Sequence, residues 1–278
     1  MKPRVMSLVL FTSFVGLVIA PTSVEFDQSF FALLAVAIGA GAAGTLNMWY
    51  ESDIDAVMSR TCLRPIPTGM ISKKQALFFG TALSLISIVM LYQFSNFLSA
   101  ALLALTIGFY FFVYTIWLKK RTAQNIVIGG AAGALPPVIV WTIATNYISI
   151  EPIILFLLIF LWTPSHFWAL SLYKSKDYQK AKIPMLPLVS GVEYTKKNIF
   201  FYALIMFPVA LAPYYLNFAS KYFLMASSLL SGYYMILCYE LLIKQKQSEI
   251  KKTAKKIFVY SIFYLFIIFL TLLIDNIL

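Results

Sequence analysis

Residues 30–55 read FFALLAVAIGAGAAGTLNMWYESDID, a long apolar run that ends in a cluster of polar and acidic side chains. A helix of about 20 apolar residues crosses the hydrocarbon core of a bilayer, so this run predicts a membrane helix. A helix also gives every backbone N–H and C=O group a partner inside lipid. Carboxylates at the end of such a helix are costly to desolvate, and they therefore indicate a function or a charged partner.

The rest of the chain has the same apolar character. Of its 278 residues 61% are hydrophobic, which is more apolar surface than a soluble domain can bury. We predict an all-α polytopic membrane protein with nine transmembrane helices in one domain, residues 1–278. Pro136 and Pro137 interrupt the fifth helix. The predicted helices span roughly residues 5–22, 29–50, 75–93, 98–117, 125–145, 151–172, 199–217, 221–243 and 257–275.

The basic residues indicate how the helices are oriented. All but one of the 22 lysines and arginines fall at the N-terminus or in alternate loops, and the exception is Lys221. Positively charged loops face the cytoplasm, so the N-terminus is expected inside and the C-terminus outside. The net charge of +11 is then a topology signal, and it does not indicate nucleic-acid binding. With no transit peptide recognised, a multi-pass protein of a prokaryotic plasma membrane is expected.

Two long polar loops, residues 51–74 and 173–198, lie four predicted helices apart on the cytoplasmic side. This spacing predicts two four-helix halves followed by a ninth helix. Parallel halves place equivalent loops opposite each other across a central cavity. The active-site loops are therefore expected to be cytoplasmic.

Asn47 lies at the end of the second predicted helix, and Glu51 and Asp55 follow in the first loop, each four residues from the one before. Steps of four on a helix keep side chains on one face, and an amide with two carboxylates is a good ligand set for Mg²⁺. Arg60 and Arg64 follow, and guanidinium groups pair well with phosphate oxygens. The group therefore suits a diphosphate with its metal. The alternative is a cluster of exposed ion pairs that caps the helix.

The second loop begins with Tyr173, Lys174 and Asp177, and Lys182 follows. Asp177 is a candidate fourth metal ligand, and the two lysines are candidates for binding phosphate oxygens. Either lysine is equally explained as a cytoplasmic topology signal.

His166 is the single histidine of the chain and lies near the cytoplasmic end of the sixth predicted helix. Such a histidine can be a packed polar residue, an iron ligand or a proton carrier, and the spacing leaves all three open. Trp162 and Tyr173 are aromatic residues near the polar motifs, where ring faces can shield a carbocation. Lipid-facing or packing roles explain aromatic residues equally well.

These motifs resemble the UbiA superfamily of intramembrane prenyltransferases, and within it the branch that farnesylates haem. The strings that carry the resemblance extend over almost the whole chain: Asn47-Met-Trp-Tyr, Asp53-Ile-Asp55, Arg64-Pro-Ile-Pro, Pro164-Ser-His-Phe-Trp-Ala-Leu170, Asp177-Tyr and Ile183-Pro-Met-Leu-Pro187. Two positions depart from the common pattern. Glu51 stands where the family usually has aspartate, and Tyr173 stands where many members have the first aspartate of a second pair.

The resemblance implies a catalytic group of Asn47, Glu51, Asp55, Asp177 and His166, with Mg²⁺ bound by the first four. It also implies transfer of a farnesyl group from farnesyl diphosphate to a vinyl group of protohaem IX, followed by addition of water. The expected protein partners are a haem A synthase or assembly factors of a terminal oxidase. Two alternatives remain: a UbiA-type enzyme that prenylates an aromatic quinone precursor, and a transporter of an anionic metabolite.

Overall fold

The structure is a computed structural model that describes residues 3–278, with side chains described from Met6 onward. Over this range every regular element is helical and no strand occurs, as the sequence predicts. Eight helical segments are long and apolar enough to cross a membrane. They are α2 (Phe26–Tyr50), α4 (Lys73–Phe94), α5 with η1 (Phe97–Leu118), α6 with α7 (Asn125–Thr145), α8 (Ile150–Tyr173), α11 (Gly191–Tyr215), α12 (Lys221–Ile243) and α13 (Gln247–Ile277).

The remaining helices are short. The first, α1 (Pro3–Val18), has 16 residues, so the ninth crossing and the orientation of the N-terminus stay predictions. Three others lie in the two long loops that the sequence places on one side of the membrane. They are α3 (Ser52–Val57), α9 (Ser175–Lys180) and α10 (Leu186–Val189).

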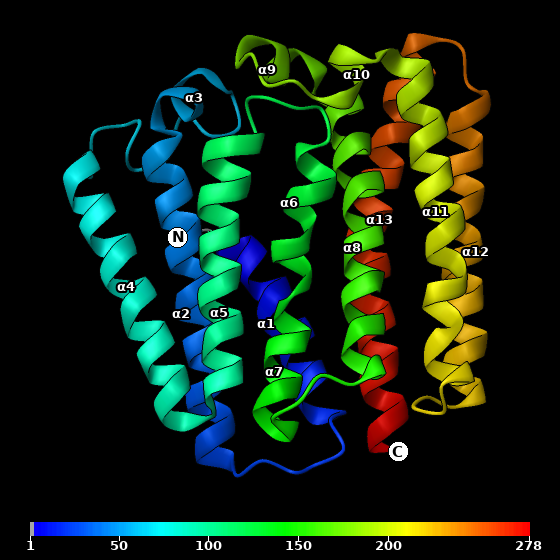
Figure 1. Cartoon of the computed structure of the whole chain (residues 1–278). Helices are drawn as coiled ribbons and strands as arrows, with labels where there is room; N and C mark the ends of the chain where they lie inside the picture. The colour runs from blue at the N-terminus through cyan, green and yellow to red at the C-terminus, as the bar shows by residue number, and fades with distance from the viewer. Residues whose placement is uncertain (1–2) are drawn as a thin grey trace. The chain divides into compact units, whose positions relative to one another are not determined.

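The chain divides into two compact units, of which the first comprises Met1–Arg121, Leu135–Ile148 and Lys180–Ile183. Its centre is α2, which packs against α1, α4 and η1 (Figure 1). Small residues permit this close packing: a Cβ on Gly80 of α4 would lie 2.9 Å from the side chain of Leu46 on α2. Membrane helices associate through such small residues because lipid tails provide no hydrophobic driving force.

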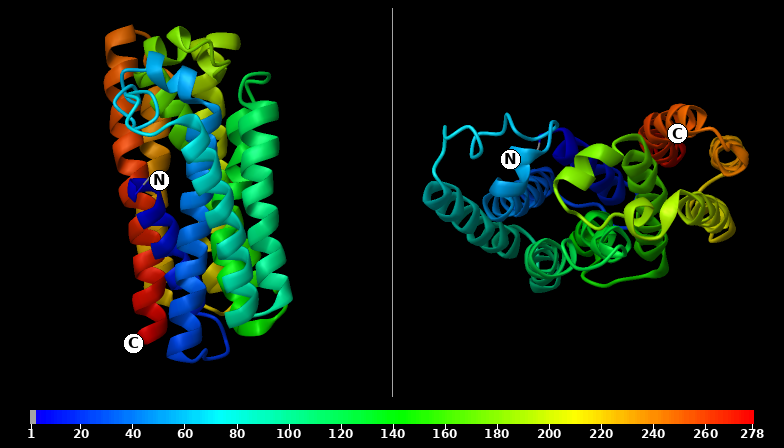
Figure 2. Two further views of the ribbon diagram at one scale, coloured as in Figure 1. Left: turned by 90° about the vertical axis from the view of Figure 1, so that its left-hand side faces the viewer. Right: turned by 90° about the horizontal axis from the view of Figure 1, so that it is seen from above.

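The second unit comprises Thr122–Ala134, Ser149–Gln179 and Pro184–Leu278. In it α8 packs on α11, α11 on α12, α12 on α13, and α13 on α8, so the four helices close into a ring (Figure 2, right). Helix α6 packs on the outside of α8. At this contact a Cβ on Gly130 would lie 2.9 Å from the Cγ2 atom of Thr163.

The fifth predicted span consists of two helices, α6 (Asn125–Ala134) and α7 (Pro136–Thr145). Prolines lack the N–H that would continue the helical ladder, so Pro136 and Pro137 begin a new helix. The break separates the units, because α6 belongs to the second and α7 to the first. The division therefore differs from the predicted halves, which kept the fifth span whole.

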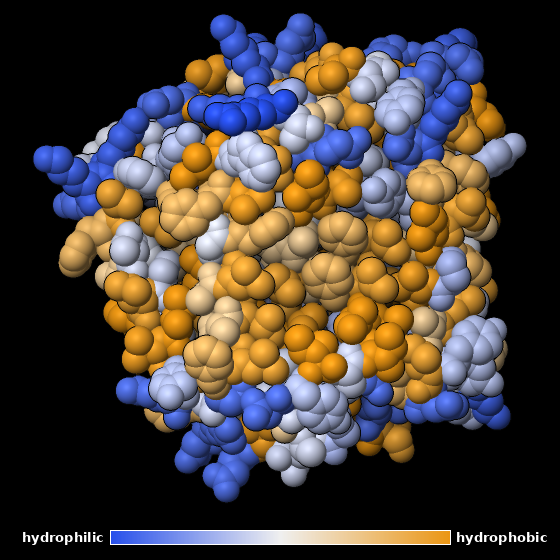
Figure 3. Space-filling view, viewed as in Figure 1, coloured by the Kyte–Doolittle hydropathy of each residue, from blue (hydrophilic) through white to orange (hydrophobic). Residues whose placement is uncertain are grey.

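Side chains along the helices are distributed as membrane insertion requires. On the face that Figure 3 shows, apolar side chains gather along the middle of the helices and hydrophilic ones at both ends. Large apolar residues such as Phe78, Phe112 and Leu229 are exposed rather than packed. Lipid can cover such surface, and with eight helices of this kind the chain is a multi-pass membrane protein.

Candidate active site

Asn47, Glu51 and Asp55 share one buried face at the junction of α2 and α3. The helical hydrogen bonds continue through the junction: the N–H of Glu51 donates to the carbonyl of Asn47 (3.0 Å), and that of Asp55 to the carbonyl of Glu51 (2.8 Å). All three residues are buried. Asp53 points the other way, with 85% of its side chain exposed and an ion pair to Lys73. The structure therefore places the three residues together, as their spacing predicts.

Lys119 is the partner of Glu51. Its Nζ lies 2.5 Å from Glu51 Oε2, although 68 residues separate the two in sequence. The other oxygen, Oε1, is buried and makes no hydrogen bond to the described residues. A buried carboxylate oxygen without a donor is costly, so it marks a place where a ligand or cation can bind.

The neighbouring contact is made by Asn47, whose Nδ2 donates to the hydroxyl of Thr115 over 3.1 Å. Thr115 belongs to η1 (Phe109–Leu118), a π-helix, and Lys119 directly follows it. Its wider turn is seen in the backbone bond from the Lys119 N–H to the Tyr114 carbonyl, five residues earlier (3.0 Å). The Thr115 hydroxyl also donates to a carbonyl five residues earlier, that of Tyr110 (2.8 Å). π-helical turns are rare and are frequent at functional sites.

Arg64, in the first loop, is the ion-pair partner of Asp55. Its Nη1 donates to Asp55 Oδ2 over 2.6 Å, and 22% of its side chain stays exposed. The Thr61 hydroxyl donates to the Asp55 carbonyl (3.0 Å), which holds the loop against α3. Arg60 is exposed in the same loop, and Lys182 is an exposed residue of the short segment Lys180–Ile183. Neither makes an ion pair within the described residues.

The donor set fits a hard divalent cation. Glu51, Asp55 and Asn47 have carboxylate and amide oxygens, the ligands that Mg²⁺ prefers, and Glu51 Oε1 has no hydrogen-bond partner among the described residues. Within residues 3–278 no three His, Cys, Asp or Glu side chains gather in a metal-binding arrangement. The carboxylates of this site are therefore a pair, and a contribution from Asp177 stays a prediction.

His166 and Trp162 lie on α8 in the second unit and share one partner, Ser261 on α13. The Trp162 Nε1–H donates to the Ser261 carbonyl (2.7 Å), and His166 Nδ1 lies 2.6 Å from the Ser261 hydroxyl. The two rings stack with centroids 4.3 Å apart, and Phe258 covers the imidazole at 4.7 Å. These contacts hold the imidazole in a fixed orientation.

Tyr173 ends α8, and two lysines lie near its ring. Lys174 Nζ is 5.0 Å from the ring centroid, and Lys255 Nζ from α13 is 5.7 Å away. Both distances are within the range of cation–π attraction. Asp177 is half-buried in the first turn of α9. The structure thus provides a basic and aromatic cluster at this end of the second unit.

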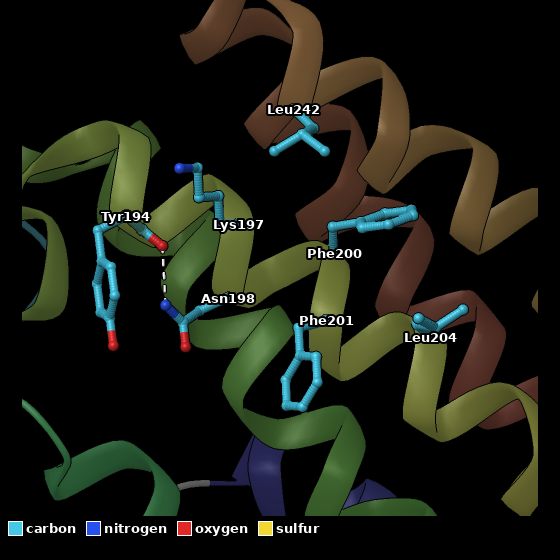
Figure 4. A pocket seen from close by; sticks show the side chains of 7 residues that line it. All are labelled: Tyr194, Lys197, Asn198, Phe200, Phe201, Leu204 and Leu242. Carbon is cyan, nitrogen blue, oxygen red and sulfur yellow. Dashed lines mark hydrogen bonds between the residues drawn. The ribbon is translucent and has the colours of Figure 1, made fainter.

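A separate groove of about 440 Å³ opens on α11 and α12 of the second unit (Figure 4). None of the predicted site residues lines it. Its lining residues are Tyr194, Lys197, Asn198, Phe200, Phe201, Leu204 and Leu242.

Comparison with known families identifies the family of the chain. The family model described as "UbiA prenyltransferase family" matches residues 9–267. The chain belongs to the UbiA prenyltransferase family. The resemblance inferred from the motifs is therefore confirmed at the level of the whole chain.

Similar proteins extend the comparison. The chain is 62% identical over 278 residues to the protoheme IX farnesyltransferase of Pelagibacter ubique, covering 100% of this chain and 92% of that protein. It is 52% identical over 277 residues to protoheme IX farnesyltransferase 2 of Mesorhizobium japonicum, covering 100% of this chain and 88% of that protein.

Solved structures show the same fold. A digeranylgeranylglyceryl phosphate synthase structure is similar with a TM-score of 0.79 and 17% identity, covering 97% of this chain and 93% of that one. A UbiA homolog from Archaeoglobus fulgidus, bound to DMAPP and Mg²⁺, is similar with a TM-score of 0.67 and 16% identity, covering 94% of this chain and 96% of that one. At these identities the likeness concerns the fold.

Four residues that contact the predicted site residues were not predicted from the sequence of this UbiA-family chain. Lys119 was counted with the topology lysines, and the basic run at the end of an aromatic helix was the one available signal. Thr115, Lys255 and Ser261 carried no local signal, because each meets its partner only through helix packing.

Proposed function

We propose that this chain transfers the farnesyl group of farnesyl diphosphate to a vinyl group of protoheme IX, adds water, and releases diphosphate. The observation that carries the proposal is the identity of 50–62% over 275 to 278 residues with several proteins named protoheme IX farnesyltransferase. The buried group of Asn47, Glu51, Asp55, Arg64 and Lys119 supports it, because it combines oxygen donors with cations.

The buried group suits departure of a diphosphate. Lys119 and Arg64 are cationic donors that can attract phosphate oxygens as negative charge grows on them. Before substrate binds, their ion pairs with Glu51 and Asp55 hold both cations in place. Arg60, Lys174 and Lys182 are exposed and can recruit the anionic head group over longer distances.

Asn47, Glu51 and Asp55 would hold Mg²⁺, with Asp177 as a further proposed ligand. When bound, the ion supplies Lewis-acid neutralisation of the diphosphate. The chain's own residues do the rest. Aromatic side chains next to the site, such as Trp49 and Phe111 with ring centroids 6.1 Å apart, can exclude water from the allylic cation.

The C–O bond to diphosphate breaks with its electron pair on oxygen, and the allylic carbon accepts the π electrons of the haem vinyl group. Water adds to the resulting carbocation and loses one proton, which leaves a hydroxyethylfarnesyl substituent. His166 is proposed to contact the haem.

The test is a reconstituted reaction. The purified protein is incubated with haem, farnesyl diphosphate and Mg²⁺, and the pigment is weighed by mass spectrometry. The proposal expects a mass gain of one farnesyl group plus one hydroxyl. Unchanged haem, together with alkylation of an aromatic quinone precursor supplied in parallel, would refute the acceptor and favour the rival enzyme.

The protein works as one domain in the plasma membrane, with both polar loops in the cytoplasm, where the basic residues lie. Its product is consumed by a haem-modifying enzyme or received by factors that assemble a terminal oxidase.

Labelling of Cys62, in the first loop, by a membrane-impermeant thiol reagent tests the orientation of the protein. Labelling is expected in inverted vesicles only.

A further inference from the structure

The hydrogen bonds around His166 determine which ring nitrogen carries the proton. The Ser261 hydroxyl donates to the carbonyl of Phe258 over 2.7 Å, one turn earlier on α13. A hydroxyl has one hydrogen, so this contact and the 2.6 Å contact with His166 Nδ1 are both satisfied only when the Ser261 oxygen accepts from Nδ1. Nδ1 therefore carries the hydrogen.

The ring is expected to be neutral. His166 is 7% exposed and makes no ion pair within residues 3–278. A buried imidazolium without a carboxylate beside it is costly, so the uncharged ring is favoured. With Nδ1 protonated, the lone pair of the neutral imidazole lies on Nε2, which makes no hydrogen bond to any described residue.

The position of Ser261 is itself fixed. Its carbonyl accepts the Trp162 Nε1–H, so backbone and side chain of this one residue hold the indole and the imidazole together. The rings of Trp162 and Phe258 pack against the imidazole, with centroids 4.3 and 4.7 Å from its own. Rotation of the ring, which would exchange the two nitrogens, would break the Nδ1 bond and disturb both stacks.

We infer that Ser261 is a positioning residue that holds His166 as its Nδ1–H tautomer and thereby presents the Nε2 lone pair to the iron of bound protoheme. A histidine that ligates a metal through one nitrogen almost always donates the other N–H to an oxygen, which orients the ring and raises its basicity. The inference rests on the proposed function for the identity of the ligand, but the tautomer follows from the contacts of Ser261 alone.

The tautomer is tested without haem. His166 is the only histidine in the chain, so protein labelled with ¹⁵N-histidine gives a single pair of ring nitrogen signals in detergent micelles. The wild type is expected to show a protonated Nδ1 and an unprotonated Nε2. Ser261→Ala is expected to shift the equilibrium toward the Nε2–H form, and Ser261→Thr to retain the original one. A wild-type ring protonated on Nε2, or an unchanged tautomer in Ser261→Ala, would overturn the inference.

The iron contact is tested by titrating ferric protoheme into the protein and recording its visible absorption. His166→Ala is expected to abolish the imidazole-ligated spectrum, and Ser261→Ala to weaken haem binding by about 10–100-fold, the usual effect of removing a ligand's hydrogen-bond partner. Ser261→Thr should restore binding. The matched control is Ser231→Ala, which removes another buried interhelical hydroxyl, bonded to Tyr264 over 3.0 Å, and should leave haem binding unchanged.

The outcomes separate the two proposals. An imidazole-ligated spectrum that survives His166→Ala would refute the iron contact while leaving the farnesyl transfer intact. A wild-type protein that binds no haem and prenylates another acceptor would refute the iron contact together with the proposed function, and the tautomer measurement would still decide the role of Ser261.

Discussion

Loss of the ion pair between Glu51 and Lys119 is expected to lower the stability of the fold strongly, and neutralising both partners to restore most of it. Lys119→Met removes the cation from the Glu51 carboxylate, which is 2% exposed and whose Oε1 has no hydrogen-bond partner in the part of the chain that the structure describes. The substitution should therefore destabilise the fold strongly. Adding Glu51→Gln removes the stranded charge, so the double variant should regain most of the lost stability.

The magnitude follows from the geometry. At the 2.5 Å separation of Nζ and Oε2, Coulomb attraction at an effective dielectric constant of about 20 is of the order of 7 kcal/mol before desolvation is subtracted. Desolvation offsets part of this, and removal of one partner of a buried pair typically costs about 3–5 kcal/mol. Replacing both partners by neutral groups is often close to neutral, so a coupling energy of roughly 2–4 kcal/mol is expected.

The assay is unfolding by SDS in mixed micelles, followed by circular dichroism, for wild type, both single variants and the double variant. The matched control is the exposed pair of Lys73 and Asp53, 2.9 Å apart, whose removal should leave the unfolding midpoint unchanged. Farnesyl transfer should stay lost in the Glu51 and Lys119 double variant despite its recovered stability. A double variant as unstable as Lys119→Met would refute the coupling.

Three further predictions concern the metal site and helix packing. Asp55→Ala should lower turnover by at least roughly 100-fold because it removes a proposed metal ligand. The circular dichroism spectrum should stay unchanged, because the Arg64 side chain left without its partner can reach water. Full activity of this variant would refute the metal assignment. Chelation with EDTA should abolish farnesyl transfer and added Mg²⁺ restore it, and unaffected product formation would exclude a dissociable divalent ion. Gly130→Ala should destabilise the fold by about 1–3 kcal/mol, since its Cβ would lie 2.9 Å from Thr163 Cγ2. Gly133→Ala, which meets nothing within 4 Å, is the control and should be neutral or stabilising in the same unfolding assay; equal effects at both positions would contradict the packing argument.

Much of the fold was predictable because membrane helices are specified by local properties. Runs of about 20 apolar residues identify helices wherever they occur, and the eight long segments overlap the predicted ones. Two of them begin earlier than predicted, α11 at Gly191 instead of residue 199 and α13 at Gln247 instead of residue 257. Residues 3–18 show the limit of this reasoning: the apolar run is clear, but the helix ends at Val18 and is shorter than predicted. The fifth span shows another limit, because the prolines indicate a break and do not indicate which helices each half packs against.

The candidate site was likewise predictable only in part. The common face of Asn47, Glu51 and Asp55 follows from a spacing of four residues, since helical hydrogen bonds join neighbours at that distance whatever surrounds them. The sequence by itself therefore determined the helices, the acidic face and the family.

Only the tertiary structure decided the partners of these side chains. Lys119 reaches Glu51 across 68 residues by way of a π-helical turn, and Ser261 reaches His166 across 95 residues. No local periodicity encodes such contacts, because they depend on how helices distant in sequence pack and rotate against one another. The surroundings of His166 are the clearest case, since the Ser261 hydroxyl contacts both its Nδ1 and the Phe258 carbonyl.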